Sequence, residues 1–91
     1  MKKLLKVKIL GRVQGVFFRA ETKRKADELG LAGFVRNEPD GTVYVEAEGE
    51  EKNLREFLKW CREGPEISRV EKIESEFSEK LKNHQGFKIA Y

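Results

Sequence analysis

The sequence predicts an α+β fold of order βαββαβ, in which an antiparallel sheet carries two helices on one face. Three observations lead to this prediction. Short segments alternate apolar and polar residues, as strands with one wet face do. Two longer segments place apolar residues at helical spacing. Glycine and proline separate these segments at the points where the chain is expected to turn.

The chain has 91 residues, so residues 1–91 are expected to form a single domain with one core. Lysines interrupt the apolar residues at the N-terminus, and no apolar stretch reaches the length of a membrane span. These features predict neither a signal peptide nor a membrane segment. The chain has one cysteine, which agrees with a reducing compartment. A cytoplasmic, monomeric protein is therefore expected.

The first half of the chain begins with a strand over residues 4–10, where leucine, valine and isoleucine alternate with lysine. Residues 11–17 form a loop. From Phe18 the apolar and small residues recur at helical spacing, and Gly30 is placed to end this helix. A strand over 31–37 follows.

A hairpin and a second helix continue the pattern. The sequence Glu-Pro-Asp-Gly at 38–41 predicts a tight turn into a strand over 42–48. The segment 51–63 has an apolar stripe at positions i, i+3, i+4 and i+7, which predicts a helix.

Two further strands complete the pattern. The fourth strand, over 67–77, changes phase near 71–72, which predicts a bulge there. A polar loop leads to the last strand, 87–91. With right-handed crossovers, this order makes a ferredoxin-like α/β sandwich.

The loop between the first strand and the first helix is the strongest candidate for a functional site. Two glycines let its backbone amides turn toward a common point, and the N-terminus of a helix adds partial positive charge. Arg19 lies in the first turn of that helix, where a cation is unfavourable unless an anion binds beside it. The loop carries no carboxylate. The amides that we expect to bind a phosphoryl group belong to Gln14, Gly15, Val16, Phe17 and Phe18.

Adjacent aromatic residues end this loop. Phe17 and Phe18 cannot both enter the core beneath one helical face, so Phe18 is assigned to the core. Phe17 then either borders the site or packs over the loop.

Asn37 is the second candidate. It ends an apolar strand directly before a turn, so rigid structure holds its amide, which can both accept and donate a hydrogen bond. The sequence allows two interpretations: an amide that positions a water molecule, or an ordinary residue at the entry to a turn.

Other reactive side chains have simpler interpretations. His84 lies in a polar loop and is expected at the surface, whereas Cys61 falls on the apolar stripe of the second helix and is expected to be buried. Glu46 and Glu48 are expected to be solvated on the outer face of a strand. The chain has no metal-ligand spacing, no nucleotide-binding motif and no nucleophile with a base, so no metal and no cofactor are expected.

Several segments together resemble the acylphosphatase family over essentially the whole chain. They are residues 11–19 (GRVQGVFFR), 30–37 (GLAGFVRN), 40–43 (DGTV), 64–65 (GP), 68–70 (SRV) and 87–91 (FKIAY). The resemblance implies a metal-independent hydrolase acting on acid anhydrides, which converts a small-molecule acyl phosphate to a carboxylate and inorganic phosphate. It also implies that Arg19 and the loop amides bind the phosphoryl group and that Asn37 orients the attacking water.

The chain departs from this family at two aromatic positions. Many relatives carry glycine or cysteine where this chain has Phe17, so the catalytic rate and the preferred acyl group are open at this position. Phe34 stands where tryptophan is frequent, and we expect little consequence from that exchange.

Two other functions compete with hydrolysis. An RNA-recognition domain has the same strand order, but Tyr44 is the single aromatic residue among the outward positions of the first and third strands, and two glutamates there would repel phosphates. No nucleic-acid partner is therefore expected, although the net charge is +3. A non-catalytic module that binds acyl or carbamoyl phosphate is the other alternative. The high charged fraction, 38%, with few amides, favours a thermophilic source.

Overall fold

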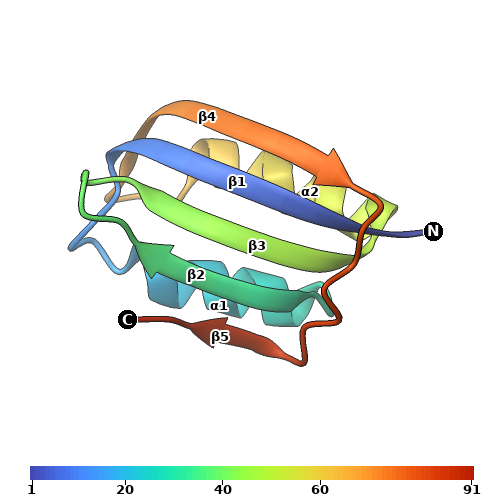
Figure 1. The fold of residues 1–91 in the computed structure, drawn as a ribbon. Helices are drawn as coiled ribbons and strands as arrows, with labels where there is room; N and C mark the ends of the chain where they lie inside the picture. The colour runs from blue at the N-terminus through green and yellow to red at the C-terminus, as the bar shows by residue number, and fades with distance from the viewer.

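The computed structural model describes all 91 residues, and its elements follow the predicted segments, with a fifth strand after the βαββαβ order. They are β1 (Lys2–Arg12), α1 (Phe18–Glu28), β2 (Ala32–Asn37), β3 (Val43–Glu50), α2 (Glu51–Glu63), β4 (Arg69–Ser78) and β5 (Phe87–Ile89). The strands form one sheet in the order β4-β1-β3-β2-β5, with both helices against the same face (Figure 1). The ferredoxin-like α+β prediction is confirmed.

The sheet is mixed, so the prediction of an antiparallel sheet is wrong at one edge. The pairs β1–β3, β1–β4 and β2–β3 are antiparallel, but β5 pairs parallel with β2. The segment after β4 crosses along the end of the sheet at which β4 finishes (Figure 1). Since β5 starts at that same end, it must run opposite to β4, which is the direction of β2.

Local irregularities in the strands mostly follow the sequence pattern. The pairing of β1 with β4 shifts register between Leu10 and Gly11, and the shift leaves Glu71 without a partner in β1. This confirms the bulge expected near 71–72. β5 is shorter than predicted, although Ala90 still donates its N–H to the Val35 carbonyl at 2.8 Å.

The core lies between the sheet and the two helices. Phe18 and Ala26 of α1 and Cys61 of α2 are buried in it, together with Val45 of β3. Gly30 ends the first helix with φ +69°, where the chain turns into β2. Neither helix is long and apolar enough to cross a membrane.

The outer face of the sheet is partly covered, which corrects two predictions. Glu46 and Glu48 are 4% and 8% exposed, not solvated. Residues 82–84 lie over them: Glu48 accepts the backbone N–H groups of all three, and His84 Nε2 is 3.1 Å from Glu46 Oε1. His84 is therefore half-buried rather than a free surface residue. The crossing from β4 to β5, which no local pattern reveals, is the physical reason.

Candidate active site

The loop between β1 and α1, residues 13–17, turns tightly before the N-terminus of the helix. Gly15 has φ +72° and Phe17 has φ +60°, so two positions in three adopt left-handed backbone. Phe17 is the N-cap of α1 and makes no side-chain cap. Its carbonyl accepts the first helical hydrogen bond, from the N–H of Glu21 at 3.1 Å.

The backbone amides of this loop are available to a ligand. None of the backbone N–H groups from Gln14 to Ala20 donates to an acceptor within the chain. Unpaired N–H groups at a helix N-terminus, with the partial positive charge of the helix, form an anion-binding concavity. The backbone N–H groups of the loop and the first helical turn can therefore donate hydrogen bonds to the oxygens of a phosphoryl group.

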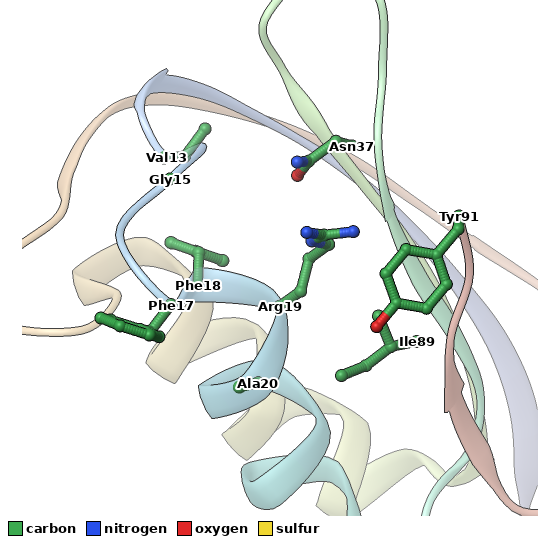
Figure 2. Close-up of a pocket in the computed structure, with 9 residues that line it drawn as sticks. All are labelled: Val13, Gly15, Phe17, Phe18, Arg19, Ala20, Asn37, Ile89 and Tyr91. Carbon is green, nitrogen blue, oxygen red and sulfur yellow. The ribbon is translucent and has the colours of Figure 1, made fainter.

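Arg19 and Asn37 come together at this concavity. They belong to α1 and β2, and Figure 2 shows the guanidinium of Arg19 directed toward the amide of Asn37. Both line a cleft of about 290 Å³. The other residues that line it are Val13, Gly15, Phe17, Phe18, Ala20, Ile89 and Tyr91.

No carboxylate forms an ion pair with Arg19. No ion pair of the chain involves it. Instead its guanidinium carbon lies 5.1 Å from the centroid of the Tyr91 ring. The positive charge at the helix N-terminus thus stays uncompensated by the protein, which favours binding of an anion.

The side-chain oxygen of Asn37 is a buried hydrogen-bond acceptor without a donor. Its Oδ1 is buried and has no hydrogen-bond partner, which is rare for a buried polar atom. The turn that follows is held by Asp40, whose carboxylate accepts the N–H of Thr42 at 3.0 Å. The side-chain oxygen of Asn37 therefore makes no hydrogen bond to this turn and is left to accept a hydrogen bond from another donor.

Two of the predicted phosphate-binding residues lie differently from the others. Gln14 and Val16 do not line the cleft with their side chains. The Gln14 amide instead bonds the turn between β2 and β3, with Nε2 2.8 Å from the carbonyl oxygens of Glu38 and Thr42. Their expected contribution was a backbone N–H, and those N–H groups are free.

Four lining residues were not found from the sequence: Val13, Ala20, Ile89 and Tyr91. Ile89 and Tyr91 reach the cleft because β5 pairs with β2, so only the strand order brings the end of the chain beside Arg19. Arg19 and Phe17, which were singled out from the sequence, both line the cleft because they belong to one short loop and helix turn.

The fold and the cleft define a class of protein, a ferredoxin-like domain whose cleft is lined by an unpaired arginine and by a loop with free backbone amides. Residues 5–89 match the family model for acylphosphatase. The chain is 44% identical over 87 residues to an acylphosphatase of Archaeoglobus fulgidus, and the match covers 96% of this chain and 97% of that protein. The chain belongs to the acylphosphatase family, and it acts as a hydrolase of acyl phosphates.

Solved structures agree with this assignment. The crystal structure of acylphosphatase from Bacillus subtilis superposes with a TM-score of 0.95 at 38% identity, over the full length of both chains. The fold also matches part of a larger protein: full-length HypF, solved in a phosphate- and nucleotide-bound form, superposes with a TM-score of 0.88 at 31% identity. That match covers all of this chain and 12% of HypF.

Proposed function

We propose that Arg19 and the backbone amides from Gln14 to Phe18 bind the phosphoryl group of an acyl phosphate, and that Asn37 orients the attacking water. The buried, unpaired Oδ1 of Asn37 is the observation that carries this proposal. A water hydrogen bonded to that oxygen points a lone pair away from it and into the cleft, toward a phosphorus atom held by Arg19.

The reaction is an in-line displacement at phosphorus. The bond from the water oxygen to phosphorus forms as the bond from phosphorus to the carboxylate oxygen breaks, and the carboxylate leaves with the electron pair. Arg19 and the free amides stabilise the charge on the three phosphoryl oxygens. None of the side chains lining the cleft is a carboxylate or an imidazole, so a phosphoryl oxygen of the substrate accepts the proton of the water.

The test is hydrolysis of a chromophoric acyl phosphate in the presence of EDTA. Arg19→Ala is expected to raise KM and lower kcat, because it removes a charge that binds both ground state and transition state. Asn37→Ala is expected to lower kcat by about 10²-fold or more with a smaller change in KM, since it removes a group that positions water. Turnover that survives both substitutions would contradict the site assignment.

Matched control variants come from α2, away from the cleft. Arg62→Ala removes an exposed arginine and Asn53→Ala removes an asparagine, and neither residue lines the cleft. Both controls are expected to keep the parent kcat and KM. Loss of turnover in EDTA with recovery on adding a divalent cation would contradict metal-independent hydrolysis.

A non-catalytic module for acyl or carbamoyl phosphate is the second candidate function. The structural match to a segment of HypF supports this alternative, because in HypF a domain of this fold is one part of a larger chain. Phosphate binding by the parent protein with no turnover of any acyl phosphate would support the module.

We also propose that the protein is a cytoplasmic monomer from a thermophile. Cys61, its single cysteine, is buried in the core, as in proteins of reducing compartments. Sedimentation velocity tests the monomer, and thermal unfolding above about 90 °C would support the thermophilic source.

A further inference from the structure

We propose that the acyl group of the substrate packs on Phe17 and in an apolar cleft beside it, which makes the protein selective for apolar acyl groups. This inference rests on the proposed function, because the position of the attacking water decides where the acyl group leaves.

The direction of the leaving group follows from the geometry of displacement. In an in-line reaction the entering and leaving oxygens lie on opposite sides of phosphorus. Asn37 defines the entering side. Figure 2 shows Phe17 at the end of the cleft away from Asn37. The carboxylate and its substituent therefore leave toward Phe17.

A second cleft begins at Phe17. It has a volume of about 420 Å³ and lies between the start of α1, the end of α2 and the segment that follows α2. Phe17 lines both this cleft and the one that holds Arg19 and Asn37, so the two clefts adjoin at this residue. The apolar residues of the second cleft are Val16, Phe17, Trp60, Pro65 and Ile67.

The charges in this cleft leave its apolar residues free for a ligand. Glu21 and Arg24 are paired with each other, with 2.5 Å between Arg24 Nη2 and Glu21 Oε1. Glu66, the remaining charged residue, is exposed to solvent. An apolar substituent entering from the phosphoryl site thus meets hydrophobic surface without breaking an ion pair.

Phe17 has no evident structural reason to be aromatic. Its side chain is 76% exposed, whereas that of Phe18 is buried, and its backbone has φ +60°, which is unfavourable for a residue with a Cβ. Ile67, across the second cleft, is 62% exposed. Contiguous exposed apolar side chains beside an active site are typical of a ligand-binding surface. An acyl group that packs on Phe17 and Ile67 would account for the exposure of both side chains in the absence of substrate.

The test compares two substrates, benzoyl phosphate and acetyl phosphate. The phosphoryl group is the same and the intrinsic reactivity of each substrate does not depend on the variant, so a change in the ratio of their kcat/KM values between parent and variant isolates the contact with the acyl group. The parent protein is expected to favour benzoyl phosphate by about tenfold, the effect of burying roughly 60 Å² of apolar surface. The variants Phe17→Gly and Phe17→Leu distinguish loss of the side chain from retention of an apolar one.

Phe17→Gly is expected to lower the ratio about tenfold and Phe17→Leu about threefold. Ile67→Ser, which leaves the loop backbone intact, is expected to lower it about threefold. Leu81→Ser is the matched control, since Leu81 is a partly exposed apolar residue that lines neither cleft, and it should leave the ratio unchanged.

Unchanged ratios in both Phe17→Gly and Ile67→Ser would overturn the acyl-binding proposal. If Arg19→Ala and Asn37→Ala still abolish turnover of both substrates, the proposed function stands. Turnover of both substrates that survives those two substitutions would instead overturn the proposed function.

Discussion

The side-chain amide of Gln14 donates to the carbonyl oxygen of Thr42 at 2.8 Å and so joins the loop before α1 to the first residues after the β2–β3 turn. The same nitrogen donates to the Glu38 carbonyl, also at 2.8 Å. Asn37 directly precedes this turn. Gln14 therefore fixes the free amides of the loop relative to Asn37, although its own side chain does not line the cleft.

The variant Gln14→Met keeps the length of the side chain and removes both hydrogen bonds. We expect kcat to fall about tenfold, because the loop amides and Asn37 lose their fixed separation. The free energy of unfolding should fall by about 1–2 kcal/mol, because the carbonyl groups of Glu38 and Thr42 each lose one of their two donors. Steady-state kinetics and urea unfolding measure the two effects, and a parent-like kcat would show that the loop is placed without Gln14.

At Phe17 the backbone conformation predicts an order of stability. Glycine adopts φ +60° without the steric cost that any side chain bears there, so Phe17→Gly should be about 1 kcal/mol more stable than Phe17→Ala. In a domain of this size that difference corresponds to about 4–8 °C in Tm. Thermal unfolding of both variants provides the measurement. Equal Tm values would contradict a left-handed conformation at this residue.

Glu46 is expected to make the free energy of unfolding depend on pH in the acid range. Burial alone would raise the pKa of this carboxyl, but hydrogen bonds from Tyr44, Lys82 and His84 outweigh it and lower the pKa from 4.5 to about 2. A depressed folded-state pKa stabilises the protein above pH 4.5, and the stabilisation is lost as the pH falls toward 2. Glu46→Gln should therefore be less stable than the parent by about 1–3 kcal/mol at pH 7.

The difference in Tm between the parent and Glu46→Gln should shrink steadily between pH 5 and pH 2. Glu74→Gln is a suitable control, because Glu74 lies on exposed β4 and its single ion pair, with Lys72, is solvent-exposed. A difference for Glu46→Gln that stays constant over this range would mean that the ionised carboxylate does not stabilise the fold.

The ring of Tyr91 contacts the guanidinium of Arg19, so we expect it to help position that group. The contact of 5.1 Å is exposed to solvent, where a cation–π interaction contributes about 0.5–1 kcal/mol. Tyr91→Leu should therefore raise KM for an acyl phosphate by about two- to fivefold, while Tyr91→Phe, which keeps an aromatic ring, should retain the parent KM. The free energy of unfolding should stay unchanged in both, because the side chain is fully exposed. A KM that responds equally to both substitutions would assign the effect to the hydroxyl group.

Much of this protein could be predicted from the sequence because it depends on neighbours along the chain. Periodicity located the strands and helices, and a change of phase located the bulge that leaves Glu71 unpaired. A glycine-containing loop that leads into Arg19 indicated an anion site, since the backbone of a loop and the first turn of a helix are set by local residues. Asn37 was singled out because it ends a strand before a turn.

Only the tertiary structure decided what lies across the sheet. The crossing from β4 to β5 buries Glu46 and Glu48 and makes the last strand parallel to β2, and neither result has a local sequence signal. The same strand brings Tyr91 beside Arg19. The sequence alone thus determined the elements and the glycine-containing loop that leads into Arg19. The tertiary structure decided which distant residues complete the cleft, because contacts between segments far apart depend on the order and direction of the strands.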